Sequence, residues 1–200
     1  MRAIAVIPGT PGSIGLTDMP EPPGEDGPVL VQTQAVGICG TDLEIINGDY
    51  GSAPPGEDRL IIGHECLGRV VQAEPGTGFG AGDLVVGIVR RRDPVPCPAC
   101  AAGHWDMCMN GRYAERGIVG VEAIVDPGLL NRNMVLQNSV LFGSVNANRD
   151  HYELAARALA QADPGWLADL ITRREPLSRW GEAYGRQPDD IKTILTFPGE

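Results

Sequence analysis

Glycine and proline clusters divide the first half of this chain into short apolar segments, and this division constrains its fold most. The sequence of 200 residues holds 27 glycines and 17 prolines. Apolar residues alternate, or form short runs, between the clusters, which is typical of β-strands. The expected strands cover residues 2–7, 28–37, 66–73 and 83–89. Short strands separated by such turns predict a small barrel or sandwich up to about residue 92.

Helices are expected mainly toward the end of the chain. Apolar residues recur at helical spacing in 150–162, from Asp163-Pro164 to Ile171, and in 180–184. Residues 191–197 read as a final strand. One earlier helix is expected over 41–46, with Thr41 or Asp42 near its N-cap and Gly48 at its end. The predicted class is therefore mainly β with C-terminal helices.

Charge and composition exclude several functions. A formal net charge of −10 repels phosphate backbones, so we expect no nucleic-acid partner. No apolar run is long enough to cross a bilayer, so we expect no membrane partner and a cytoplasmic protein. Five cysteines are an odd number, which in a reducing compartment favours metal ligands or core residues.

The first chemical motif is a cysteine-rich loop. Cys97 and Cys100 are separated by two residues, and Cys108 follows. This spacing fits three thiolate ligands of a tetrahedral zinc, with Asp93 or His104 able to supply a fourth. The alternative is a disulfide or redox pair of Cys97 and Cys100.

The second motif joins two distant segments. Cys39 ends an expected strand, and His64 and Glu65 precede another. A thiolate, an imidazole and a carboxylate suit an open catalytic zinc, and Thr41 could take a proton from a bound alcohol. Alternatively, Cys39 is a small core residue and His64 an ordinary loop residue.

Two glycine-rich segments, 9–15 and 76–82, superficially suggest a dinucleotide fingerprint. Neither has the required context of a preceding strand and a following helix, so both are expected to be turns. A different segment, 142–148, ends an apolar run in small and amide residues that could contact a ligand. Helix capping by Asn148 or Asp150 is the alternative there.

With these motifs, the chain resembles the zinc-dependent medium-chain dehydrogenase/reductase family, in particular its glucose (aldose) 1-dehydrogenase branch. Segments 110–118 and 143–149 add to the resemblance, which covers nearly the whole chain. It implies a GroES-like, partly open β-barrel catalytic domain, a zinc cofactor, NAD(P) in the complete enzyme, and a sugar or polyol substrate.

The resemblance also implies residue roles. Cys39, His64 and Glu65 would belong to the catalytic zinc shell, with Thr41 beside the reacting hydroxyl. Sugar hydroxyls would contact Thr41, Glu65, Glu115 and Asn146. The nicotinamide would lie near Ser144, Val145 and Asn146. The structural zinc would be held by Cys97, Cys100 and Cys108, with Asp93 where the family pattern has a fourth cysteine.

Relative to this family, the Rossmann cofactor domain and its glycine fingerprint are missing between the two parts of the catalytic domain. We expect residues 1–120 to form the first part, with a metal lobe at about 93–116. Residues 121–146 would be a remnant of the end of the cofactor domain, and residues 147–200 the second part. Such a chain should bind zinc and possibly sugar without transferring hydride alone.

Two other readings remain open at the level of sequence. One is a natural Rossmann-less module that binds zinc or sugar, or catalyses a redox-neutral lyase, isomerase or cyclase reaction. The other is a scaffold whose unpaired strand associates with a second copy through its edge.

Overall fold

The structure is a computed structural model, and it describes residues 1–24, 27–54, 56–87, 95, 97–104, 107–109 and 147–197. The chain divides into two compact units. One comprises Met1–Val89 with Gln161–Glu200, and the other comprises Arg90–Ala160. The first unit carries all the described strands, so each unit is considered separately below.

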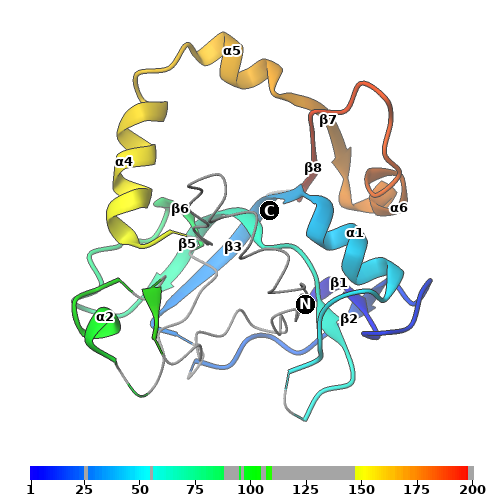
Figure 1. The fold of residues 1–200 in the computed structure, drawn as a ribbon, viewed down its shortest axis with the longest axis horizontal. Helices are drawn as coiled ribbons and strands as arrows, with labels where there is room; N and C mark the ends of the chain where they lie inside the picture. The colour runs from blue at the N-terminus through cyan, green and yellow to red at the C-terminus, as the bar shows by residue number, and fades with distance from the viewer. Residues whose placement is uncertain are drawn as a thin grey trace, which may run out of the picture. The chain divides into compact units, whose positions relative to one another are not determined.

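The first unit contains two sheets, whose strands, apart from β4, are labelled in Figure 1. The smaller sheet has the order β2-β1-β4, and all of its pairs are antiparallel. Its strands are β1 (Arg2–Val6), β2 (Gly15–Asp18) and β4 (Leu60–Ile61). The larger sheet has the order β6-β5-β3-β8-β7. Its strands are β3 (Val29–Ile38), β5 (Glu65–Ala73), β6 (Leu84–Val86), β7 (Ile171–Pro176) and β8 (Lys192–Thr196).

Pairing within the larger sheet joins distant parts of the sequence. β3 pairs antiparallel with β5 on one side and with β8 on the other, so Gly37 lies opposite both Glu65 and Ile194. β7 runs parallel to β8. β6 and β7 are the edge strands of this sheet, and association of two copies through an edge stays a prediction.

The helices are short. The first unit contains α1 (Gly40–Asn47), α5 (Pro164–Asp169), the 3₁₀-helix η3 (Leu177–Arg179) and α6 (Trp180–Ala183), which contacts β7 and β8. The second unit contains α2 (Pro98–Ala101) and α4 (Arg149–Leu159). In the described parts of the chain, no helix has the length and apolar character needed to cross a membrane.

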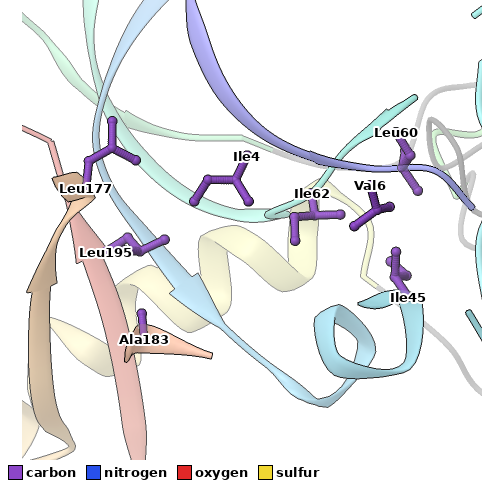
Figure 2. Close-up of a cluster of buried hydrophobic side chains, with 8 residues drawn as sticks. All are labelled: Ile4, Val6, Ile45, Leu60, Ile62, Leu177, Ala183 and Leu195. Carbon is purple, nitrogen blue, oxygen red and sulfur yellow. The ribbon is translucent and has the colours of Figure 1, made fainter. Parts of the chain in front are cut away.

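One apolar core binds the two sheets and three of the short helices together (Figure 2). Its eight buried side chains are Ile4, Val6, Ile45, Leu60, Ile62, Leu177, Ala183 and Leu195. Leu195 is 1% exposed and comes from β8, whereas Ile45 comes from α1. The core therefore anchors α1 and the last strand, β8.

The predicted class, mainly β with C-terminal helices, is confirmed. Both glycine-rich segments are turns, with positive φ at positions such as Gly12 (76°) and Gly76 (88°). Asn148 is the N-cap of α4, and its side chain accepts from the amides of Asp150 and His151. Gly48 ends α1 in the left-handed conformation, with φ 82°.

Two expectations about helices are wrong. The N-cap of α1 is Cys39 rather than Thr41 or Asp42, because Asp42 occupies the third helical position and reaches back to the cap. The helix expected to include Ile171 ends at Asp169, and Ile171 begins β7. Trp166 on α5 is 57% exposed.

Candidate metal centres

The first candidate centre lies where β3 passes into α1. Cys39 is the N-cap residue, and its backbone N–H donates to Asp42 Oδ2 over 2.8 Å. Because Gly37 pairs with Glu65, the start of β5 lies beside the end of β3. This register brings His64 and Glu65 to the Cys39 thiol across a gap of 25 residues between Cys39 and His64.

Three potential ligand atoms converge there. Cys39 Sγ lies 3.2 Å from His64 Nε2, and these atoms and a Glu65 carboxylate oxygen all lie within 4.8 Å of one another. Cys39 and His64 are partly buried, and Glu65 is exposed. Thiolate, imidazole and carboxylate are zinc ligands, and three protein ligands leave one tetrahedral position for water or substrate.

Asp42 provides a test of whether this cluster fits a metal. Its carboxylate is 1% exposed, and its Oδ1 atom has no hydrogen-bond partner among the described residues. That atom lies 3.7 Å from His64 Nδ1. Coordination through Nε2 places the imidazole proton on Nδ1, where Asp42 would face it. The buried, unpartnered acceptor behind His64 therefore fits a metal-ligating imidazole.

The Cys39 thiol is held in its neutral form without a metal. Burial raises the pKa of the Cys39 thiol, and the nearby Asp42 carboxylate raises it further. The backbone N–H groups of Asp42 and Thr41 lower it in part. The Thr41 side chain also bonds to the sulfur. The expected place of Thr41 beside the reacting hydroxyl stays a prediction.

Lys192 is a part of this site that the sequence motifs did not reveal. Its Nζ lies 2.7 Å from Glu65 Oε2 and 3.0 Å from Oε1, and it donates to the Ile38 carbonyl over 3.1 Å. Lys192 is the only lysine in the chain, and this was the only feature of the sequence that could have pointed to a role for it. It holds the Glu65 carboxylate in place from β8.

Gly37 explains how the Glu65 carboxylate fits against the sheet. A Cβ atom on Gly37 would overlap Glu65 Oε2. Gly63, with φ 105°, lets the chain turn just before His64, and a Cβ there would approach Val36 Cγ1 to 2.7 Å. The glycines of both motifs therefore shape the site rather than bind anything.

A pocket of about 270 Å³ opens beside Cys39 in the first unit. Three of its lining residues are cations, namely Arg173, Arg186 and Lys192. Tyr184 also lines it, and burial raises the pKa of this phenol, so the ring acts as a neutral hydroxyl at ordinary pH. The pocket offers polar groups next to the candidate metal ligands.

The second candidate centre lies in the other unit. The thiols of Cys97, Cys100 and Cys108 all lie within 4.8 Å of one another, and Cys97 Sγ is 3.6 Å from Cys100 Sγ. Backbone N–H groups of Cys100 and Met109 lower the pKa of Cys97 to about 7. Burial and the neighbouring thiols raise the pKa of Cys100 to about 11. Clustered thiols of this kind suit zinc.

His104 does not join these thiols in the described structure. Its Nδ1 atom lies 3.0 Å from Asn148 Nδ2. Since Asn148 Oδ1 already accepts two backbone amides, its NH₂ group is the donor to His104. The remaining expected site residues lie outside the described residues, namely Asp93, Glu115, Ser144, Val145 and Asn146.

Comparison with known families agrees with this geometry. Residues 25–143 match the alcohol dehydrogenase GroES-like domain, and residues 106–197 match the glucose dehydrogenase C-terminus. The GroES-like architecture expected from the resemblance is thereby confirmed. The matches overlap between residues 106 and 143, and together they cover most of the chain.

Individual relatives point the same way. The chain is 45% identical over 218 residues to "Glucose 1-dehydrogenase 2" of Vulcanisaeta moutnovskia, covering 98% of this chain and 61% of that protein. It is 47% identical over 122 residues to the glucose 1-dehydrogenase of Thermoproteus tenax, covering 60% of this chain and 33% of that protein. The chain thus spans between about a third and three fifths of the length of these relatives.

A solved structure shares the fold. Haloferax mediterranei glucose dehydrogenase, described in complex with NADP, Zn and gluconolactone, superposes with a TM-score of 0.81 at 21% identity, with 100% of each chain covered.

Proposed function

This chain belongs to the zinc-dependent medium-chain dehydrogenase family as a homologue of the glucose 1-dehydrogenases, and from that premise we propose that it is the zinc- and sugar-binding part of an aldose 1-dehydrogenase. The complete enzyme would oxidise the C1 hydroxyl of an aldose to the lactone with NAD(P)⁺. The convergence of Cys39, His64 and Glu65, with Asp42 behind His64, carries the proposal.

Cys39, His64 and Glu65 would hold the zinc ion. When bound there, zinc supplies Lewis-acid polarisation of a substrate oxygen. Asp42 would keep the His64 proton on Nδ1, and Lys192, which bonds both Glu65 carboxylate oxygens, would compete with zinc for that ligand. Thr41, whose side chain bonds to the Cys39 sulfur, would accept the proton of the sugar hydroxyl and pass it on.

The pocket beside Cys39 would hold the sugar. Its polar lining, which includes Tyr184 and Thr193, can exchange hydrogen bonds with a polyol. We propose that Glu65, Glu115 and Asn146 also contact sugar hydroxyls, and that Ser144, Val145 and Asn146 lie near the nicotinamide. Asp93 would complete a structural zinc with Cys97, Cys100 and Cys108.

The domain boundaries follow the same proposal. Residues 1–120 and 147–200 would be the two parts of the catalytic domain, and residues 121–146 a remnant of the end of the cofactor domain. Neither glycine-rich segment forms a phosphate-binding loop, since both are turns. The 200-residue chain should accordingly bind zinc and sugar without transferring hydride.

The test separates binding from turnover. The purified chain is loaded with zinc, its metal content is measured, and glucose binding is followed by ligand-observed NMR. The chain is then mixed with glucose and NAD⁺ or NADP⁺, and reduced nicotinamide is followed at its absorbance maximum. Bound zinc and glucose without reduction support the proposal.

Cys39→Ala and Cys66→Ala are the matched variants, because Cys66 lies outside the cluster on β5. Both variants are made in a Cys100→Ser background, which disables the cysteine lobe. In that background Cys39→Ala should lose zinc and glucose binding, whereas Cys66→Ala should keep both. Reduction of nicotinamide that disappears in Cys39→Ala would show that the chain holds a cofactor site, which would overturn the claim about hydride transfer. Zinc and glucose binding that survive in Cys39→Ala would overturn the site itself.

A further inference from the structure

The three thiols of the second unit form a geometry suited to chemistry between the sulfurs themselves. Cys97 Sγ lies 3.6 Å from Cys100 Sγ, which is van der Waals contact. A disulfide bond is about 2.05 Å long, so a movement of roughly 1.5 Å would join these two sulfurs. Cys108 Sγ lies within 4.8 Å of both, so the cluster holds a dithiol and a third thiol in reach.

The local backbone fixes this arrangement. Cys97 precedes α2 as its N-cap residue, and Cys100 lies within that helix one turn later. The backbone N–H of Met109 donates to Cys97 Sγ over 3.3 Å, which ties the segment carrying Cys108 to the start of α2. The local backbone therefore holds the three sulfurs close to one another.

The thiols differ in access to solvent. Cys97 and Cys100 are buried, at 6% and 5% exposed, whereas Cys108 is only partly buried. Its neighbours Met107 and Met109 are 55% and 75% exposed. A small reagent would reach Cys108 first. Cys100 Sγ lies within 4.8 Å of Cys108 Sγ and 3.6 Å from Cys97 Sγ, so Cys100 can take the oxidation from Cys108 and pass it to Cys97.

We propose that the metal-free cysteine cluster is a redox site, oxidised by a low-molecular-weight disulfide to a Cys97–Cys100 disulfide, with Cys108 as the entry thiol. The inference does not rest on the function proposed for the Cys39 site. It concerns a modification that would compete with metal binding at the same thiols.

The reaction balances in three exchanges. The Cys108 thiolate attacks one sulfur of the external disulfide RSSR, forms Cys108–S–S–R and releases the first RSH after protonation. Cys100 attacks Cys108 Sγ, forms the Cys100–Cys108 disulfide and releases the second RSH. Cys97 attacks Cys100 Sγ, and Cys108 leaves and is protonated. Overall, two cysteine thiols are oxidised and RSSR is reduced to two RSH.

Zinc should oppose this reaction. A thiolate bound to a metal is less able to attack a disulfide. Two cysteines joined in a disulfide, in turn, cannot bind the metal. Oxidation would thus make the lobe unable to bind zinc until a reductant restores the thiols. The lobe would then report the redox state of its surroundings.

The test uses the full 200-residue chain with oxidised glutathione as the probe. The chelator-treated, reduced chain is incubated with the probe, and samples are quenched with iodoacetamide for intact mass and peptide mapping. We expect loss of two hydrogens, about 2 Da, with Cys97 linked to Cys100 and Cys108 alkylated. Addition of two equivalents of zinc beforehand, one for each candidate centre, should slow the reaction by at least about tenfold.

Single variants test the order of events. Cys108→Ser should slow the oxidation but still give the Cys97–Cys100 link, and Cys97→Ser should stop at a Cys100–Cys108 link. Cys66→Ser is the matched control and should behave like the parent chain. The parent chain alone already decides the main point, so a variant that fails to fold does not weaken the test.

Three outcomes would overturn the proposal. The first is a parent chain that only gains one glutathione and never loses two hydrogens. The second is a disulfide that includes Cys39 or Cys66 instead of the Cys97–Cys100 pair. The third is an oxidation rate that zinc leaves unchanged.

Discussion

Asp42 Oδ1 lies 3.7 Å from His64 Nδ1, while Asp42 Oδ2 accepts the backbone N–H of Cys39 over 2.8 Å. One buried carboxylate therefore touches both the cap of α1 and the back of the imidazole. Asp42 contacts two candidate metal ligands, Cys39 and His64, without being a ligand itself. The carboxylate that bonds back to the N-cap of α1 therefore also positions the candidate metal ligands.

Asp42→Asn should weaken zinc binding at the Cys39 cluster by roughly 10- to 100-fold. The asparagine oxygen can still accept the Cys39 N–H, so the helix cap survives. Its NH₂ group, however, would donate to His64 Nδ1 and place the imidazole proton on Nε2, where the metal should bind. Competition with a chromophoric chelator measures the affinity, in a Cys100→Ser background that disables the cysteine lobe.

Glu44→Gln is the control for this experiment, because Glu44 is an exposed carboxylate on the same helix. It removes one negative charge at a similar position in the sequence and should leave zinc binding unchanged. Equal zinc affinity in Asp42→Asn and Glu44→Gln would show that Asp42 does not orient His64.

Gly37→Ala should disturb the Glu65 carboxylate, because the added methyl group would overlap Glu65 Oε2. Overpacking of this kind costs about 1–3 kcal/mol, unless Glu65 moves and releases Lys192. Either response should weaken zinc binding, which the same chelator titration measures, while urea denaturation measures stability. Gly15→Ala is the control, since a Cβ at Gly15 meets no atom within 4 Å. Parent-like zinc affinity and stability in Gly37→Ala would contradict this account.

Lys192→Met should strengthen zinc binding by about 3- to 10-fold, because the Glu65 charge would no longer be neutralised by an ammonium group. The loss of stability should stay below about 1 kcal/mol, since Lys192 and Glu65 are 31% and 41% exposed and water screens the pair. The effect on zinc should vanish in a Glu65→Gln background. Arg186→Met, which removes another cation of the same pocket, should leave zinc affinity unchanged. Weaker zinc binding in Lys192→Met would reverse the role assigned to this lysine.

The sequence predicted the longer strands and the two ligand clusters, but not the contacts that complete them. β3 and β5 were predictable because their apolar residues alternate, whereas β2 and β4, of four and two residues, are too short to show a period. β7 was not predicted as a strand, and its first residue, Ile171, was assigned to a helix, because the inward positions of β7 carry Arg173 and Glu175, which pair with other charges instead of forming an apolar stripe. Lys192 meets Glu65 across 127 residues only because β3 lies between β5 and β8, a topology that spacing along the chain does not encode.

The ion pair of Asp190 with Arg173 should stabilise the folded protein at neutral pH and lose this effect in acid. The Arg173 guanidinium donates to both carboxylate oxygens, over 3.2 and 2.8 Å, and lowers the pKa of Asp190, with the Gln187 N–H adding to the effect. A carboxyl whose pKa is lower in the folded state stabilises the fold above its unfolded pKa, about 3.9 for aspartate. That stability is lost as the pH falls through the lowered folded pKa, because the folded protein must then bind a proton it resists.

Asp190→Asn removes this linkage, so the difference in unfolding free energy between parent and variant should be largest near neutral pH. It should shrink as the pH falls below about 4. Urea denaturation at a series of pH values measures it, with Asp189→Asn, a change at an exposed neighbouring carboxylate, as the control. The Arg173 guanidinium also donates to the carbonyls of Glu182, Ala183 and Gly185, and these bonds should keep it in place in Asp190→Asn and limit the destabilisation. A difference that stays constant from neutral pH to about pH 2 would show that the Arg173–Asp190 pair does not set the acid limit of this fold.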